Sequence, residues 1–369
     1  MQRPPHREPA ALLQVRIAAR QRRERDELRC RLALSAGRSG SPVNAGSGSA
    51  GADVRSSTAA LAAGLMQHRV TINFHPDRRA SDGQTAAESL RDNGIYHNQY
   101  RTGVSAGSLT AFAGGVRESW ERRLFGAESA TLPPGLRPRY GGLDVAAHAD
   151  GACPRFGSCY LVLDPSVLSR CTFLVGDSHR ATDSAAADLG TVDQPVGVLA
   201  GLLERALAGD ALNLPGGIDV VIDQIIRPPA NDDRLRGQPV GRALDEYIET
   251  QVHGPVALDS DVAQLVIDPS FDKTETGKAL ADAAERHGLQ LTRHPGFALG
   301  TDDLALVPDD FRGPEVIELA YRTAREYGAP ITAASIGALA REPAADRDPL
   351  RQQVKQLWHM LVAFGRSPA

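Results

Sequence analysis

The sequence predicts an α+β fold, with a mixed or antiparallel sheet flanked by helices. Runs typical of strands alternate with runs typical of helices, but without the regular spacing of βαβ units or any internal repeat. The chain has 369 residues, 42% of them hydrophobic and 23% charged, so it can close one large core or two ordinary ones. We expect residues 56–275 to form the α+β body and residues 276–369 a mostly helical C-terminal region.

The N-terminal segment differs from the rest of the chain. Residues 1–36 contain nine arginines and four acidic residues, and residues 35–51 are rich in Gly and Ser, as in a flexible linker. We therefore expect residues 1–55 to be a largely disordered basic arm and linker. Within it, the RQRRERDELR run is either the solvated surface of a helix or a contact for an acidic protein partner or nucleic acid.

The first half of the body is predicted to hold two strands and two helices. RVTINF, at 69–74, is rich in β-branched residues and is followed by His75 and a proline, which ends the strand. A helix is expected over 83–94 because it closes with a glycine, and 95–103 is predicted to be the second strand. The next helix spans 116–126.

The second half of the body is predicted to begin with two strands at 158–163 and 171–176. A helix starts near Asp193, since leucines and valines after it recur at helical spacing. Residues 247–258 are predicted to be the last strand, and Asp259 can cap a helix after it. Beyond residue 275, amphipathic helices that start at Pro314 and cover 350–361 indicate packing.

Composition excludes several classes of protein. No apolar run reaches the roughly 18 to 20 residues of a membrane span, and the first residues lack the apolar core of a signal peptide. We expect a soluble cytoplasmic protein, with export by a route without a cleaved signal as the open alternative. Four cysteines without a CxxC pair suggest a reducing compartment and no zinc site. The net charge of −4 gives no overall footprint for nucleic acid, and the sequence has no Walker loop, no HExxH helix and no GxGxxG that follows a strand.

Six motifs occur in an order that resembles a bacterial domain family catalogued only as of unknown function. They are FHPDR (74–78), YRTGVSAGSLTAFAGG (100–115), RPRYGGLDV (137–145), RFGSCYLVL (155–163), TFLVGDSH (172–179) and YIETQVHG (247–254). The resemblance covers about residues 66–300 and implies no established activity.

A second set of features is similar to the divided site of ADP-ribosyltransferases. It comprises a strand ending at His75, an aromatic-x-Thr-Gly-x-Ser element at 100–105, Tyr140 beside glycines, and Glu-x-Gln at 249–251. This resemblance implies a split-sheet core, NAD as the substrate without a metal, and cleavage of the bond between nicotinamide and ribose. The chain lacks a clear Ser-Thr-Ser triplet and places its glutamate before its glutamine, which reverses the commoner order.

The resemblance assigns Glu249 and Gln251 to catalysis. Departure of nicotinamide leaves an oxocarbenium-like sugar, whose positive charge a carboxylate stabilises. Residues two apart in a strand share a face, so Glu249, Gln251 and His253 lie together, either in a cleft or on a solvent-exposed sheet face. Glu246 is the competing carboxylate.

The other expected contacts are with the NAD itself. His75 can donate a hydrogen bond to a ribose hydroxyl or a phosphate, and Arg78 and Arg101 can each offer paired N–H groups to the pyrophosphate. Tyr140 can stack on the cationic nicotinamide ring, and His253 is also expected among the NAD-binding residues.

Three neighbouring residues complete the expected NAD site. Thr102, Gly103 and Ser105 would align the strand and hold the catalytic carboxylate, and Gly103 would let the backbone approach the ligand closely.

Two other interpretations stay open. His75, Asp77, Asp177 and His179 offer nitrogen and oxygen ligands for a metal-dependent hydrolase. Alternatively, the body is a non-enzymatic interaction module whose arm contacts an acidic partner. For a transferase, the sequence leaves the acceptor open among protein, nucleic acid, small molecule and water.

Overall fold

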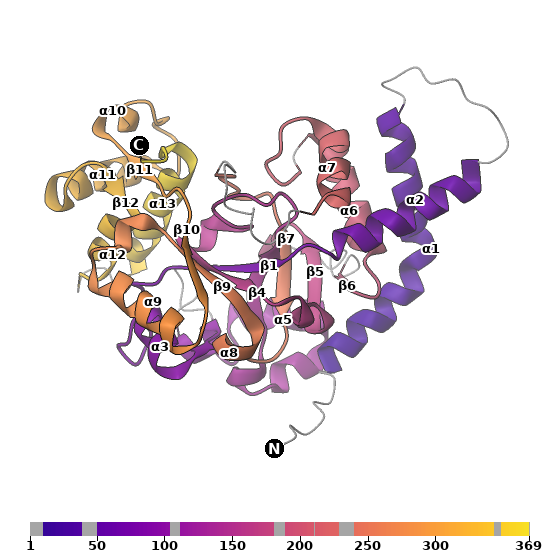
Figure 1. Cartoon of the computed structure of the whole chain (residues 1–369), viewed down its shortest axis with the longest axis horizontal. Coiled ribbons are helices and arrows are strands. Elements are labelled where there is room, and N and C mark those ends of the chain that lie inside the picture. The colour runs from indigo at the N-terminus through magenta and orange to yellow at the C-terminus, as the bar shows by residue number, and fades with distance from the viewer. Residues whose placement is uncertain are drawn as a thin grey trace.

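The computed structural model of the chain describes residues 10–38, 50–103, 111–180, 189–209, 211–228, 240–342 and 348–368. It confirms the α+β fold class, since a mixed eight-stranded sheet lies at the centre and helices surround it (Figure 1).

The central sheet has the strand order β10-β9-β4-β1-β3-β7-β5-β6. Neighbouring strands are antiparallel, except that β9 and β10 are parallel. As a result, β1 and β7 run in the same direction on either side of β3. The bounds are β1 Val70–Phe74, β3 Arg139–Leu143, β4 Cys159–Leu163, β5 Cys171–Val175, β6 Gly190–Thr191, β7 Ile248–Val252, β9 Val262–Ile267 and β10 Gln290–Arg293.

The two faces of this sheet differ in chemistry, because residues directly opposite in antiparallel strands share a face. One face belongs to the main hydrophobic cluster and carries Ile72, Leu161, Phe173, Ile248 and Val252. The other face carries polar side chains, namely Thr71, Asn73, Tyr140, Thr172, Glu249 and Gln251. All of these polar residues except Tyr140 are buried, which requires internal hydrogen-bond partners.

Helices pack around the sheet in three groups. Beside β5 and β6, at the right of Figure 1, lie α1 Ala10–Arg38, α2 Ala50–Leu65, α6 Val196–Ala208 and α7 Gly217–Ile226. Lower in the view lie α3 Ala86–Asn93, α5 Val116–Phe125 and α9 Glu275–Arg286, of which α3 and α9 pack together. The C-terminal group contains α10 Thr301–Leu304, α11 Pro314–Tyr327, α12 Ala333–Ala340 and α13 Asp348–Phe364.

Short elements connect these groups. The two-residue strands are β2 Ile95–Tyr96 paired with β8 Val256–Ala257, and β11 Ala298–Leu299 paired with β12 Ile331–Thr332. Besides α10, the one-turn α-helices are α4 Gln99–Thr102 and α8 Leu258–Asp261. The 3-10 turns are η1 Ala127–Thr131, η2 Pro134–Leu136, η3 Pro154–Phe156, η4 Pro165–Arg170, η5 Ser178–Arg180 and η7 Pro269–Phe271.

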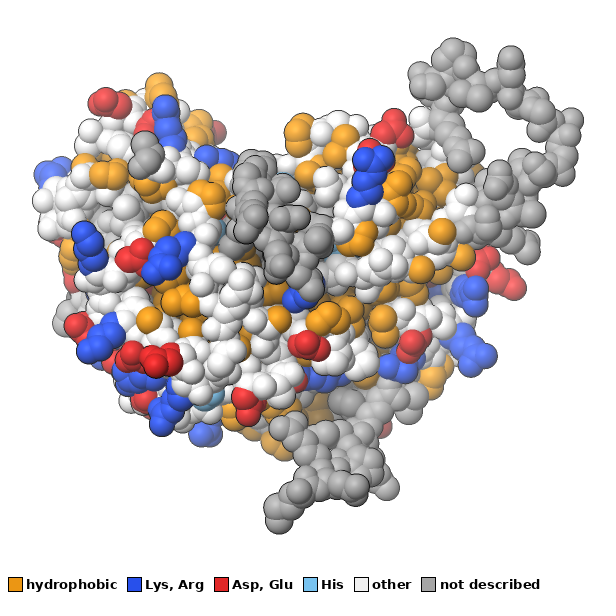
Figure 2. Space-filling view, viewed as in Figure 1, with side chains coloured by type: hydrophobic (Ala, Val, Ile, Leu, Met, Phe, Trp, Pro, Cys, Tyr) orange, Lys and Arg blue, Asp and Glu red, His pale blue; other side chains and the backbone are white. Residues whose placement is uncertain are grey.

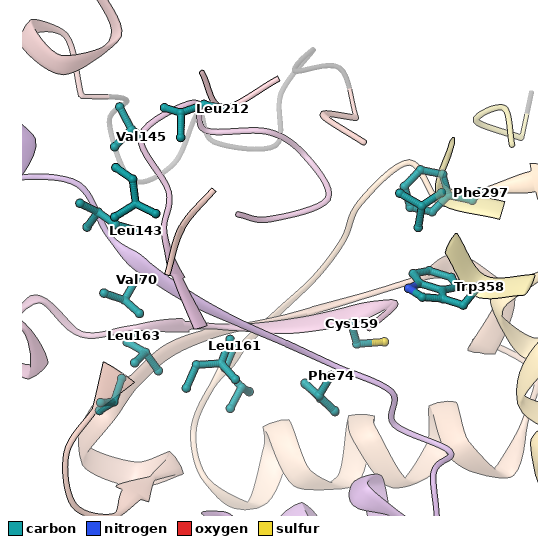
Figure 3. Packing of buried hydrophobic residues seen from close by; sticks show 14 of the residues in the cluster. Val70, Phe74, Leu143, Val145, Cys159, Leu161, Leu163, Leu212, Phe297 and Trp358 are labelled. Carbon is teal, nitrogen blue, oxygen red and sulfur yellow. The ribbon is translucent and has the colours of Figure 1, made fainter. Parts of the chain in front are cut away.

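The C-terminal helices share a core with the sheet. A single cluster of buried side chains extends from Val70 and Phe74 of β1 to Phe297 and Trp358. Figure 3 shows Trp358 and Phe297 beside Cys159 at one end of this cluster. A fold in which the C-terminal region packs on the sheet places residues of α13 near the strand ends.

Local sequence signals placed several elements correctly. The expected strand at 69–74 is β1, and the helix at 83–94 is α3, which ends where Gly94 adopts a left-handed φ of 62°. The helix at 116–126 is α5, and the strands at 158–163 and 171–176 are β4 and β5.

The second strand, predicted over residues 95–103, is wrong beyond Tyr96. Only Ile95–Tyr96 is extended, and α4 follows. Asn98 causes the change, because its side chain caps α4 by accepting from the Arg101 N–H at 3.1 Å. Its amide also donates to the carbonyls of Pro134 and Arg137, at 2.6 and 2.9 Å, which anchors the turn to a distant loop.

The prediction that residues 247–258 form the last strand is also wrong, because this segment holds β7 and β8 and further strands follow it. The helix expected after Asp259 is only the four-residue α8, and the chain then forms β9 and β10. The Asp261 carboxylate, at 2.8 Å from the Ala257 N–H, stabilises this short turn. VAQLVI is then long and apolar enough to form β9, next to β4.

Much of the expected disordered arm is helical. Helix α1 packs on α6 and buries Leu12, Val15 and Cys30. Its arginines pair with acids of the body, since Arg29 lies 2.6 Å from Glu204 and Arg16 lies 2.9 Å from Asp193. These arginines therefore have intramolecular partners, while the residue boundaries proposed for the domains stay predictions.

Surface properties agree with a modest net charge. Figure 2 shows basic and acidic side chains interspersed over the face in view. Within the described residues, none of the helices combines the length and apolarity needed to cross a bilayer.

Candidate functional site

A cavity of about 500 Å³ opens on the polar side of the sheet, at the end of β1. Its wall comes from the segment after β1, from α3, α4 and α5, from β3, η3 and β7, and from α13. Segments from residue 73 to residue 355 thus meet around one space. A volume of this size holds a nucleotide-sized ligand.

Glu249 of β7 presents its carboxylate to this cavity although the residue is only 4% exposed. One oxygen, Oε2, accepts from the backbone N–H of Ser178 at 3.2 Å, and the other, Oε1, accepts from the amide of Gln251 at 2.7 Å. Burial and the nearby negative charge of Asp177 raise the pKa of Glu249 from its ordinary 4.5 to about 7. The carboxyl can therefore change protonation state near neutral pH.

A chain of buried hydrogen bonds lies behind Glu249. The Thr172 hydroxyl donates to Gln251 Oε1 at 2.7 Å, so its oxygen can only accept from His253 Nε2, which lies 3.1 Å away. Burial lowers the pKa of His253 to about 4, which keeps the ring neutral, and the hydrogen bond to Thr172 requires its proton on Nε2. Each donor in this chain thus points toward Glu249 and fixes the orientation of its carboxylate.

Aromatic side chains form a second wall, next to Glu249. Tyr140 donates its hydroxyl to Glu121 at 2.8 Å, and the guanidinium carbon of Arg117 lies 4.6 Å from the ring centroids of both Tyr140 and Trp120. Arg117 covers one face of the Tyr140 ring, so a stacked nicotinamide would have to use the other face. Trp120 also packs edge-on against His179, with centroids 5.0 Å apart.

Basic groups line the third side. His75 packs edge-on against Trp358 of α13, with ring centroids 5.1 Å apart, and burial together with Arg78 holds its pKa well below the ordinary value. A neutral His75 can donate one hydrogen bond and accept another. Arg78, Arg101 and Lys355 also line the cavity, which gives it a predominantly basic lining.

The structure brings most of the candidates from the sequence to this one cavity. Glu249, His75, Arg78, Arg101, Thr102 and Tyr140 all line it. Gln251 and His253 are fully buried behind Glu249, so this strand face is not exposed to solvent. Gly103 ends α4 with a φ of 70° and is not a lining residue, and Ser105 lies outside the described residues.

Glu246, the competing carboxylate, and one of the four proposed metal ligands, Asp77, lie outside the cavity. Glu246 is outside the cavity and pairs with Arg205. Asp77 is buried against Gly337 and lies 3.9 Å from Arg341, away from the cavity that His75, Asp177 and His179 line. Across the described part of the chain, no cluster of three or more His, Cys, Asp or Glu residues is arranged to hold a metal ion.

Sequence reasoning missed several lining residues, namely Arg117, Trp120, Arg155, Gln352 and Lys355. The last two belong to α13, whose apolar stripe indicated packing alone. One signal was present in the sequence: only three of the 41 Lys and Arg residues are lysines, and Lys355 is one of them.

Comparison with known proteins identifies a family. A family model described as a protein of unknown function, DUF3626, matches residues 69–364. The match covers the sheet and the C-terminal helices, so it confirms the expected family and extends it beyond residue 300. A search of curated proteins finds no match.

Proposed function

Because the chain belongs to the DUF3626 family of proteins of unknown function, we propose a function from its cavity. The protein binds NAD and breaks the bond between nicotinamide and ribose, as an ADP-ribosyltransferase or an NAD glycohydrolase. The observation that carries this proposal is Glu249, a buried carboxylate that faces a nucleotide-sized cavity with a basic lining.

Cleavage of the bond between nicotinamide and ribose is faster when a carboxylate stabilises the positive charge that develops on the sugar. When the C–N bond breaks, its electron pair goes to the nicotinamide nitrogen, and positive charge develops on the ribose. An ionised Glu249 stabilises that charge, and the buried surroundings strengthen the attraction relative to water. The hydrogen bonds from Ser178 and Gln251 hold the carboxylate in one orientation, so it need not reorganise during the reaction.

The second substrate decides the reaction class. Addition of water to the ribose carbon, with loss of its proton to solvent, releases free ADP-ribose and makes the protein a glycohydrolase. Addition of a nucleophilic group of a protein, nucleic acid or small molecule makes it a transferase. Measuring free ADP-ribose beside nicotinamide separates the two.

The test is nicotinamide release from NAD by the purified full chain. We expect Glu249→Gln to abolish most of the release while the protein stays folded. The matched control is Glu246→Gln, which removes a neighbouring carboxylate that pairs with Arg205 outside the cavity. Equal activity of wild type and Glu249→Gln, or equal loss in both variants, would overturn the role of Glu249.

A further inference from the structure

Three segments that are distant in sequence, the end of β1, η3 and α13, contact one another at the basic end of the cavity. The indole Nε1 of Trp358 donates to the Pro154 carbonyl at 2.8 Å, which ties α13 to η3. The same tryptophan packs edge-on against His75 at the end of β1. Arg78 follows β1, Arg155 belongs to η3 and Lys355 to α13, so all three line the cavity from segments that contact one another.

The spacing of residues along α13 places Lys355 on the side of the helix that lines the cavity. It precedes Trp358 by three residues, so the two side chains are neighbours on the helix surface, and Gln352 lies one turn before it on the same side. Both Gln352 and Lys355 line the cavity. One face of the last helix thus contributes a positive charge and a hydrogen-bonding amide to this space.

These cations outnumber their partners. Arg155 pairs with Asp245 and lies 3.8 Å from Asp177, but among the described residues no carboxylate lies within ion-pair distance of Arg78 or Lys355. Asp77, the neighbour of Arg78 in sequence, lies nearer to Arg341. Burial and repulsion from Arg155 and Arg78 lower the pKa of Lys355, and burial and Arg351 lower that of Arg78. A bound anion stabilises positive groups that are held close together in this way.

We infer that Arg78 and Lys355 form a subsite for a diphosphate group, held between the end of β1 and α13. The guanidinium offers a fixed fork of donors and the ammonium three rotatable ones, which together suit the oxygens of linked phosphates. The inference rests on the proposed function for the identity of the ligand as NAD. It adds that the NAD diphosphate lies against the last helix.

The experiment is calorimetric titration of the full chain with inorganic pyrophosphate, inorganic phosphate, ADP-ribose and nicotinamide riboside. We expect Lys355→Met to weaken binding of pyrophosphate and ADP-ribose by about ten-fold or more, the usual effect of losing a charge-assisted hydrogen bond. Lys355→Arg should keep most of the affinity. Binding of nicotinamide riboside, which has no phosphate, should not change.

Two further variants make the test specific. Arg78→Gln should weaken the same two ligands, which supplies a second measurement if Lys355→Met is poorly folded. Lys278→Met removes an exposed lysine of α9 and should leave every affinity unchanged.

Three results would overturn the inference. They are unchanged pyrophosphate binding in folded Lys355→Met and Arg78→Gln, an equal loss of nicotinamide riboside binding, and tighter binding of phosphate than of pyrophosphate. Lys355-dependent pyrophosphate binding without nicotinamide release refutes the proposed function alone. Release that needs Glu249 but not Lys355, with pyrophosphate binding unchanged, refutes the subsite alone.

Discussion

Glu249→Gln should change the pH dependence of stability as well as activity. The pKa of Glu249 is about 7 in the folded chain and near 4.5 as an ordinary side chain. Between these values the folded state binds more protons than the unfolded state, so stability of the wild type falls as pH rises through this window. Glutamine does not titrate, and the variant loses this component of the pH dependence.

The size of the effect follows from the shift. One pKa unit corresponds to about 1.4 kcal/mol, so the shift from 4.5 to about 7 represents roughly 3 kcal/mol at full ionisation. Part of this is already lost at pH 5, because the unfolded side chain is mostly ionised there. Between pH 5 and pH 8, the variant should therefore gain about 2 to 3 kcal/mol of unfolding free energy relative to wild type.

Urea denaturation of both proteins at pH 5 and pH 8 measures this difference. The mismatch of the glutamine amide with the Ser178 N–H is present at both pH values, so it cancels in the comparison. A relative stability that is the same at pH 5 and pH 8, or that falls with pH, would refute a raised pKa at Glu249.

Three other changes test the structure around the site. Thr172→Val leaves Gln251 Oε1 and the His253 Nε2–H buried without partners, so it should cost roughly 2 to 5 kcal/mol of unfolding free energy, and Thr172→Ser much less; similar urea midpoints would contradict this. In the wild type, kcat/KM for nicotinamide release should rise with pH through about 7, as Glu249 ionises; a profile flat from pH 5 to 9 would contradict that. Gly337→Ala should lower the thermal midpoint, although this exchange normally favours a helix, because the new Cβ would overlap the Asp77 carboxylate; an unchanged or higher midpoint would contradict it.

Elements with local causes could be predicted from the sequence. Gly94 ends α3 because a left-handed residue is needed there, and the alternation in β7 correctly places Ile248 and Val252 in the core. The turn at Asn98 could not be predicted, since it depends on carbonyls of Pro134 and Arg137, which are close only in the folded chain.

The residues of the candidate site also divide into those that the sequence could predict and those that it could not. Glu249, His75 and Tyr140 lie in strands or at a strand end, where sequence order and alternation indicate which side chains can meet. Lys355 could not be placed, because its position depends on the packing of Trp358 against His75 and Pro154. Long-range packing therefore determines which cations complete the cavity.

The place of α13 has a consequence for synthesis of the protein. Strand β1 emerges from the ribosome before α13, and the other strands of the central sheet are also made before the wall that holds Lys355. A growing chain that has completed the central sheet still lacks this wall, so the cavity is complete only after α13 has been made. A product that ends before α13 would keep the strands of the central sheet and lack this wall.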